Sequence, residues 1–427
     1  MKAERAKHPT VFGRLLGRVA LVEKHEMPAV IASFLLFFFV LGGYFCVRPV
    51  RETVGTILGR DRVADLYLWT WVGSILIIPI FGWLVGRLKR SVCLPLIYGF
   101  VAVSLAAIGI ALRANEGSIA IGQFFYVFIS ILSLFLTSIF WAFLLELFDS
   151  AQVKRLFGVI AAGGTAGALA GPGITYLTVS TIGNGGILFV GAAMFVMAII
   201  CQRTLLRIWK ARSAAHQEDR PIGGNPFAGF LLVLRSPYLL AIALFVVLLA
   251  AANTFLYFEQ LRLVEATFAK TQDRTKVFAA LDWAVQGLTI VCQLFLTGRI
   301  ASRLGVSVLL AIVPAVMIFG FLSLAVAGTF TVLAIVFVVR RVGEYAFVRP
   351  GREILFSRVD NETKYKAKNV IDVPVYRASD AITAQVSTAL EGGSLGTAAV
   401  ALLGALVATV WAVNGWWLGK RSDARRA

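Results

Sequence analysis

The chain has 427 residues, of which 59% are hydrophobic and only 15% are charged, and its mean hydropathy is +0.82. This composition is far too apolar for a soluble domain. The formal net charge of +18 raises the possibility of a nucleic-acid-binding protein, but the distribution of that charge along the chain argues against this class.

The first predicted element is an amphipathic helix from Val11 to Val22. Its apolar side chains share one face, and Arg14 and Arg18 lie opposite, so we expect it to lie on the cytoplasmic leaflet of a membrane. The first long apolar run begins near Met27 and is too long for the hydrophobic region of a cleavable signal peptide. No such peptide is therefore expected.

A helix that spans a membrane needs about 20 predominantly apolar residues. Twelve segments of the chain satisfy this, which predicts an all-α integral membrane protein with twelve transmembrane helices. The predicted spans are 28–50, 65–85, 92–112, 120–148, 157–182, 186–206, 237–260, 278–298, 306–327, 329–356, 371–390 and 396–418.

Lysine and arginine concentrate in alternate connections between these spans. The loops between them, at 180–186, 327–329 and 391–396, carry almost no positive charge. This pattern is the positive-inside rule, which predicts that both termini are cytoplasmic. It explains most of the net charge without a nucleic-acid partner. The basic connections are the N-terminal segment, Arg87 to Arg90, Lys154 and Arg155, 203–220, Lys364 to Lys368 and the C-terminal tail.

Cysteine and histidine give no sign of a metal site or cofactor. The four cysteines are scattered through apolar segments without CxxC spacing, so we expect them to be small core residues. The three histidines, His8, His25 and His216, lie outside the predicted spans. We therefore expect no cofactor, no metal and no histidine-based proton relay in the membrane.

The chain divides into two halves at a polar stretch from Lys210 to Pro226. Residues 82–92 match residues 298–308 at five of eleven positions, with a constant shift of 216. Six spans repeated in parallel is the arrangement of major facilitator transporters. The predicted parts are an interfacial segment (1–27), a first six-helix bundle (28–206), a linker (207–236), a second six-helix bundle (237–418) and a tail (419–427).

Two sets of motifs carry a family resemblance. Gly82, Leu84, Arg87 and Arg90 match the loop G-x-L-x-D-R-x-G-R-R of the major facilitator superfamily, although Gly86 stands in place of the usual aspartate. More narrowly, four stretches resemble the ATP/ADP-type nucleotide translocase family and its bacterial relatives: 44–52, 154–164, 345–350 and 364–380.

This resemblance implies exchange of a nucleotide or a related phosphorylated anion. It also implies a multi-pass protein of the bacterial cytoplasmic (inner) membrane. We expect its partners to be a small anionic solute and the lipid bilayer, and the chain to be a monomer.

Seven arginines lie within or at the ends of the predicted spans. A cation at the bilayer centre costs roughly 2.5–3.5 kcal/mol on insertion scales, so such residues normally face an interior path. Their guanidinium groups offer a bidentate fork that suits phosphate or carboxylate. The seven are Arg48, Arg51, Arg340, Arg341, Arg349, Arg352 and Arg377.

The strongest constellation is in the tenth span, where Arg340 and Glu344 share one helical face and Arg341 adds a further charge. Two arginines against one glutamate leave positive charge for a substrate or a gate; the alternative is an ion pair that neutralises itself. In the first span we expect Arg48 to face the cavity. Arg51 either forms an outer gate pair with Glu52 or reaches water at the end of the span.

The remaining charged residues of the spans have other predicted roles. We expect Arg349 and Arg352 to form inner-gate salt bridges or bridges between the halves rather than to bind substrate. Arg377 and Asp380 are three residues apart and can pair, and with Asp372 they make the eleventh span too polar to face lipid.

Three further acids, Glu146, Glu259 and Asp282, are either proton carriers with burial-perturbed acidity or partners of the arginines. Glycine repeats every four residues at Gly163, Gly167 and Gly171. This spacing predicts close packing of the fifth span against another helix.

The favoured function is a secondary transporter that works by alternating access, as an exchanger. No P-loop is present, so ATP hydrolysis should not drive it, and without histidine in the spans we do not expect an enzyme. Two alternatives remain. A proton-coupled transporter or exporter of a non-nucleotide solute is favoured if Glu344 and Asp282 neutralise Arg340 and Arg341. A non-transporting scaffold is favoured if the arginines scatter to the periphery.

Overall fold

The computed structural model describes residues 22–23, 25–87, 90–115, 117–210, 228–357, 359, 367–391 and 396–424. Within these residues every regular element is a helix, and each of the twelve predicted spans falls on a helical stretch. The predicted all-α fold is thereby confirmed. Except for Val22, the predicted interfacial helix lies outside the described residues.

The described residues of the first half form five continuous helices. Helix α6 carries two predicted spans, because the backbone turns at Gly183, whose φ of 71° and ψ of 174° are not helical. Glycine adopts a positive φ without steric cost, so it can break a helix at this point. The helices are α2 (Met27–Leu58), α3 (Arg60–Arg87), α4 (Arg90–Ala114), α5 (Ile119–Leu147) and α6 (Ser150–Lys210).

Three helical stretches of the second half contain a π-helical turn, which is rare and occurs often at functional sites. The elements are α7 (Ala228–Arg235), α8 (Pro237–Thr267), α9 (Thr271–Cys292) continuing through η1 (Gln293–Thr297) into α10 (Gly298–Arg303), α11 (Gly305–Ala327), α12 (Phe330–Gly343) continuing through η2 (Glu344–Val348) into α13 (Arg349–Phe356), η3 (Ile371–Val375) followed by α15 (Tyr376–Glu391), and α16 (Gly396–Asp423). The described part of the predicted linker 207–236 is helical in the end of α6 and in α7, and Ser236 follows as the extended cap of α8.

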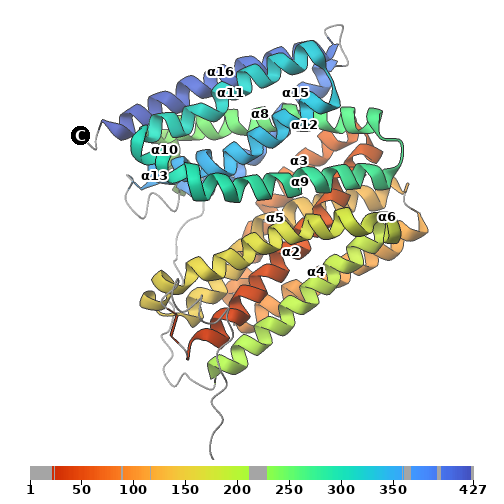
Figure 1. Ribbon diagram of the computed structural model, residues 1–427, viewed down its shortest axis with the longest axis vertical. Coiled ribbons are helices and arrows are strands. Elements are labelled where there is room, and N and C mark those ends of the chain that lie inside the picture. The colour runs from red at the N-terminus through yellow and green to blue at the C-terminus, as the bar shows by residue number, and fades with distance from the viewer. Residues whose placement is uncertain are drawn as a thin grey trace, which may run out of the picture.

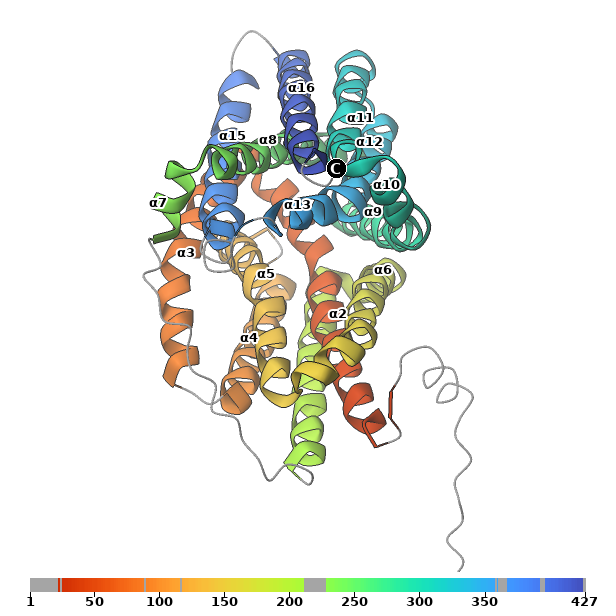
Figure 2. The ribbon, with the colours of Figure 1, turned by 90° about the vertical axis from the view of Figure 1, so that its left-hand side faces the viewer.

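Buried apolar side chains form two separate cores. One is built mainly from α2, α4, α5 and α6, and the other mainly from α8, α11, α12 and α16. Figure 1 shows the corresponding bundles, which approach each other where α6 bends and α9 begins and spread apart toward the end where the C-terminus lies. Figure 2 shows the same two groups of helices from the side.

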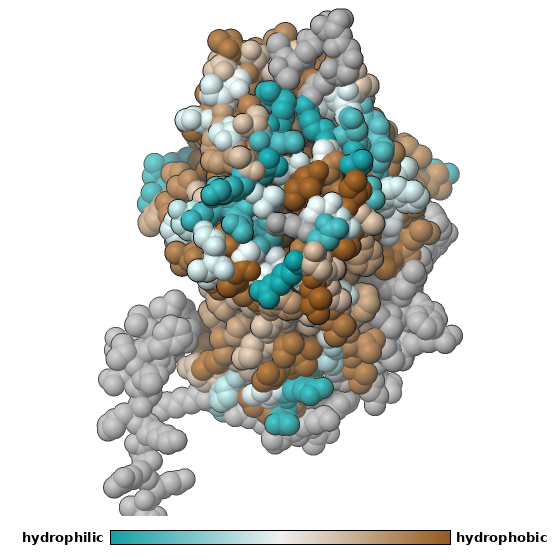
Figure 3. Space-filling view, turned by 90° about the vertical axis from the view of Figure 1, so that its right-hand side faces the viewer, coloured by the Kyte–Doolittle hydropathy of each residue, from teal (hydrophilic) through white to brown (hydrophobic). Residues whose placement is uncertain are grey.

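The outer surface has the character expected of a membrane protein. Among the described residues, eight helices are long and apolar enough to cross a membrane. Large hydrophobic side chains such as Val103, Leu177, Phe319 and Val326 are exposed on them, which suits contact with lipid. Figure 3 looks onto the end at which the bundles meet, and hydrophilic side chains gather across this face.

The glycines of α6 pack directly against α2, as their spacing predicts. A methyl group on Gly163 would collide with the backbone oxygen of Phe34, and one on Gly167 with that of Phe38. A third, on Gly171, would lie 2.5 Å from the backbone oxygen of Gly42. The two backbones are therefore in contact along three turns, and this contact fixes the position of α2.

This packing predicts that Gly167→Ala lowers the melting temperature of the purified protein. Overpacking of this kind typically costs about 1–3 kcal/mol. Gly158→Ala is a matched control on the same helix, because an added methyl group there meets nothing within 4 Å and alanine favours a helix. Thermal unfolding in detergent measures both variants. Equal melting temperatures for the two would contradict the assigned contact.

Candidate functional site

A cavity of about 830 Å³ lies between the two bundles. Its walls come from α2, α3, α5 and α6 of the first half and from α8, α9, α12, α13 and α15 of the second, together with the π turns η1, η2 and η3. The lining includes Glu353 of α13, a helix that Figure 1 shows toward the end where the chain terminates, and it extends to Lys368 and Asp372. At the other end, hydrogen bonds join α2 directly to α9. The cavity therefore opens at one end and is closed at the other.

All seven predicted arginines line this one cavity. With Lys368 they make eight cationic side chains in its wall, against five carboxylates. The carboxylates are those of Glu52, Glu344, Glu353, Asp372 and Asp380. Convergence on a single cavity is the arrangement that distinguishes a transport path from a scaffold with peripheral charges.

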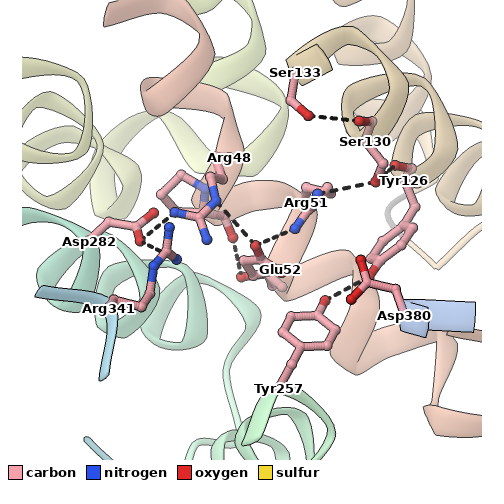
Figure 4. A network of polar contacts seen from close by, with 12 residues as sticks. Arg48, Arg51, Glu52, Tyr126, Ser130, Ser133, Tyr257, Asp282, Arg341 and Asp380 are labelled. Carbon is pink, nitrogen blue, oxygen red and sulfur yellow. Dashed lines mark hydrogen bonds and ion pairs between the residues drawn. The ribbon is translucent and has the colours of Figure 1, made fainter. Parts of the chain in front are cut away.

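The first cluster of charges centres on Asp282 of α9. Its Oδ1 accepts hydrogen bonds from Arg48 at 2.7 Å and from Arg341 at 3.4 Å. The Arg48 Nε also lies 3.5 Å from Glu52, and Arg51 donates to Glu52 at 2.6 Å. Figure 4 shows these side chains pointing toward one another from α2, α9 and α12. Arg48 therefore faces the cavity, as predicted.

Arg51 does not reach water at the end of its span. Helix α2 continues to Leu58, beyond the predicted end of the span at residue 50. Arg51 is therefore held inside the helix, where its side chain is 13% exposed and lines the cavity. Arg51 instead pairs with Glu52, which is the contact that the alternative prediction, an outer gate pair, requires.

The second cluster centres on Glu344, at the start of the π turn η2. Its two carboxylate oxygens accept from Arg340 at 3.1 Å and from Arg349 at 3.2 Å. Tyr345 lies beside it, with its hydroxyl 2.6 Å from Arg341 and its ring centroid 4.3 Å from the guanidinium of Arg349. The cluster thus holds three arginines around one carboxylate and one phenol.

These two clusters carry more positive than negative charge. Arg340 and Arg341 are not neutralised by Glu344 and Asp282, because the same carboxylates also serve Arg349 and Arg48. Guanidinium groups that share a carboxylate in a poorly hydrated site can accept a further anion. Five arginines share three carboxylates: Arg48, Arg51, Arg340, Arg341 and Arg349 against Glu52, Asp282 and Glu344.

A third cluster lies across the cavity on α5 and α15. Asp380 accepts from Thr254 at 2.9 Å and from Arg377 at 3.4 Å. Ser130 of α5 accepts from Arg51 through its hydroxyl at 3.1 Å and from Arg377 through its backbone oxygen at 3.5 Å. Ser130 therefore brings together arginines from the two halves.

Among the described residues, the ion pairs of Arg349 and Arg352 do not join the two halves, which leaves the inner-gate salt bridge as the predicted alternative for them. Arg352 pairs with Asp372 at 3.1 Å, and Arg349 pairs with Glu344. All four residues belong to the second half, because α13 packs beside η2 and η3 in the same bundle. The neighbouring pair of Lys368 and Glu353 also stays within that half.

Of the three isolated acids, Asp282 lies behind the cavity wall, where it pairs with the lining residues Arg48 and Arg341. Glu259 does not line it and pairs with Arg262, three residues later on α8, at 2.5 Å. The side chain of Glu146 lies outside the described residues. Within the part of the chain that the structure describes, no group of three or more histidine, cysteine or acidic side chains could hold a metal ion.

The sequence analysis missed the hydroxyl groups of the cavity. Tyr126 of α5 and Tyr257 of α8 line it and share a hydrogen bond of 2.8 Å that joins the halves. Ser130, Ser133 and Thr137 line it from one face of α5. Their spacing of three and four residues in an otherwise apolar span was a signal that could have identified this face.

The chain is similar in sequence to two known carrier proteins. No family model matches the chain. The "ADP,ATP carrier protein 1" of Chlamydia trachomatis serovar D is 21% identical, over 96% of this chain and 91% of the relative. The protein of the same name from Chlamydia muridarum is 20% identical, over 86% and 82%.

Solved transporter structures align over nearly the whole chain. The nucleoside transporter NupG aligns over 93% of this chain and 99% of its own, with 15% identity and a TM-score of 0.60. A bacterial homologue of the iron transporter ferroportin, in its inward-facing state, aligns over 90% and 99%, with 13% identity and a TM-score of 0.64. The fold is that of a major facilitator transporter. In such a fold, the cavity between the bundles is where a substrate site is expected.

The shared carboxylate of Glu344 predicts a stability effect. Glu344→Gln leaves Arg340 and Arg349 without their charged partner, which should cost about 3–5 kcal/mol and lower the melting temperature. Phosphate in the buffer should restore part of the loss, because a phosphate oxygen can replace the carboxylate. Glu353→Gln is the control, since Glu353 is 51% exposed and, among the described residues, pairs with Lys368. A similar loss in both variants, insensitive to phosphate, would argue against an anion site beside Glu344.

Proposed function

We propose that the protein is a secondary transporter that moves a nucleotide or a related phosphorylated or organic anion by alternating access. We further propose that it works as an exchanger in the bacterial cytoplasmic membrane. The observation that carries this proposal is the excess of guanidinium groups over carboxylates in the middle of a cavity that is open at one end.

The residue types suit a phosphorylated anion. Arg340, Arg341 and Arg349 come from about two and a half turns of the same helical stretch, and all three line the cavity. Several guanidinium forks on one surface can bind phosphate oxygens in pairs, and a desolvated site strengthens each contact. The cavity volume also falls in the range of about 300–1,000 Å³ that is typical of small-molecule sites.

The relatives support a nucleotide as the cargo. The two chlamydial proteins are named as ADP,ATP carriers, and NupG is described as a nucleoside transporter. Three amide side chains, those of Asn253, Gln286 and Gln293, also line the cavity. Amides of this kind can bind the hydroxyl and ring nitrogen groups of a nucleoside.

The closed end supports alternating access. The bundles have separate cores, so each can rotate as a rigid body. As they rotate, the hydrogen bonds between α2 and α9 break at the closed end, and new hydrogen bonds form between the bundles at the end that is now open. Exchange is the mode we favour because an empty cavity keeps unbalanced positive charge, which a bound anion offsets before the bundles move.

A proton-coupled transporter is the second candidate, and the buried carboxylates of Asp282 and Asp380 favour it. Both are less than 5% exposed, and either could carry a proton. The two candidates differ in their driving force: exchange depends on a counter-substrate, whereas proton coupling depends on a pH gradient.

Uptake of labelled ATP into proteoliposomes tests the proposal. We expect uptake that requires ADP or phosphate inside the vesicles and that falls at least tenfold in Arg341→Ala, since loss of one charge-assisted contact to a desolvated anion costs about 1.5–3 kcal/mol. Arg299→Ala is the control, because Arg299 is exposed on α10 and does not line the cavity.

Two results would count against the proposal. Absence of nucleotide uptake by folded native protein would remove the nucleotide as cargo. Uptake driven by a pH gradient with empty vesicles would instead favour the proton-coupled candidate.

A further inference from the structure

Helices α2 and α9 run antiparallel, and a row of three polar contacts between them closes the cavity. The contacts belong to different halves of the molecule and follow one another along both helices, so they break together when the bundles separate at this end. From the cavity outward, they are Arg48 with Asp282 at 2.7 Å, Thr53 with Thr275 at 2.6 Å, and Thr56 with Arg274 at 3.0 Å. We call this row the α2–α9 seam.

The outer two contacts of the seam are tied to the surrounding structure. Thr275 also donates to Asn184 of α6 at 2.7 Å. Arg274 also donates through its Nε to the backbone oxygen of Phe268 at 2.7 Å. Neither contact involves a residue of the cavity wall, so a substrate cannot reach them directly.

The innermost contact is different, because both of its guanidinium partners are exposed to the cavity. Arg48 and Arg341 line the cavity, and Asp282 holds both of them through one oxygen. The other oxygen, Oδ2, is buried without a hydrogen-bond partner among the described residues. Asp282 therefore occupies, as an internal anion, a place that an incoming phosphate would also favour.

We propose that Asp282 couples substrate binding to opening of the closed end, by competing with the substrate anion for Arg48 and Arg341. This proposal rests on the proposed function and assigns a residue to its coupling step. When an anion binds to the two arginines, the contact between Arg48 and Asp282 weakens. The α2–α9 seam is then held only by its two outer contacts, whose acceptors are uncharged threonine hydroxyls. The energy barrier to opening of the closed end therefore falls.

The physical requirement for such coupling is a difference in affinity between the two conformations. While Asp282 keeps the seam closed, it occupies Arg48 and Arg341, so an anion gains no binding energy from the closed seam. When the seam is open, the anion can bind both arginines. Without substrate, Asp282 binds Arg48 and holds the empty carrier closed. This is the property that makes exchange depend on a counter-substrate.

Asp282→Asn tests the proposal, since the amide keeps the shape of the side chain and removes its charge. We expect this variant to bind ATP on the order of tenfold more tightly, because a like charge beside the site is gone. We also expect labelled ATP uptake that no longer requires ADP inside the vesicles. General damage to the fold would weaken ATP binding, so it would not produce tighter ATP binding together with uptake that is independent of internal ADP.

Glu259→Gln is the matched control. It makes the same chemical change on a carboxylate of the same half that pairs with Arg262 and does not line the cavity. It should bind ATP and exchange it as the native chain does. Unchanged or weaker ATP binding by Asp282→Asn, at a native melting temperature and with exchange still dependent on ADP, would overturn the proposal.

Hydrogen exchange of the native chain and both variants, without ligand, separates this proposal from the proposed function. Faster exchange in Asp282→Asn is expected for peptides that cover the end of α2 and the start of α9, because amides at an opened seam lose protection. If the native chain bound neither ATP nor inorganic phosphate, the cargo assignment would fail. The role of Asp282 in the seam would then be tested by hydrogen exchange alone. Unchanged exchange at the seam would then overturn the role of Asp282, and faster exchange would support it.

Discussion

The placement of arginine in an apolar environment governs this structure. A guanidinium group in a membrane interior is costly unless it is paired or hydrated, and this chain places seven of them around one cavity. The carboxylates that could neutralise them are fewer, and each central one is shared. Asp282 serves Arg48 and Arg341, and Glu344 serves Arg340 and Arg349. Sharing gives each of these arginines a charged partner while it leaves an excess of positive charge.

The shared pairs depend on the packing of helices that carry no charge at the contact. The glycines of α6 allow α2 to approach until their backbones touch, and this fixes the rotation of α2 about its axis. The same rotation directs Arg48 and Arg51 toward the cavity instead of toward lipid. On the opposite wall, the π turn η2 begins at Glu344, between Arg340 and Arg349. An apolar contact and a local irregularity of the backbone thus position the two central clusters.

The sequence predicted the spans and the convergence of the arginines, because both follow from local rules. Hydropathy determines which segments enter a membrane, and the cost of a buried cation determines that Arg340 and Arg341 face an interior. The sequence did not predict which residues far apart in the chain pair with one another. Nothing in the residues near Asp282 indicates that it meets Arg48, 234 positions away. The pair of Glu259 and Arg262, by contrast, has a spacing of three residues that the sequence does show. The ends of the spans were also imprecise, since Arg51 lies inside α2 and not at its end.

Two acceptors join arginines of the first half to arginines of the second: Asp282 receives Arg48 and Arg341, and Ser130 receives Arg51 and Arg377. Both acceptors lie where the bundles meet, so their contacts exist only while the halves hold their present angle. Rocking of the bundles must separate at least one arginine from each acceptor, and that arginine keeps only the partner within its own half, which leaves its charge less well compensated. A small anion that moves with the arginines compensates this charge. The positive excess in the cavity and the shared acceptors between the halves are therefore two parts of one arrangement, in which a bound anion lowers the barrier between conformations.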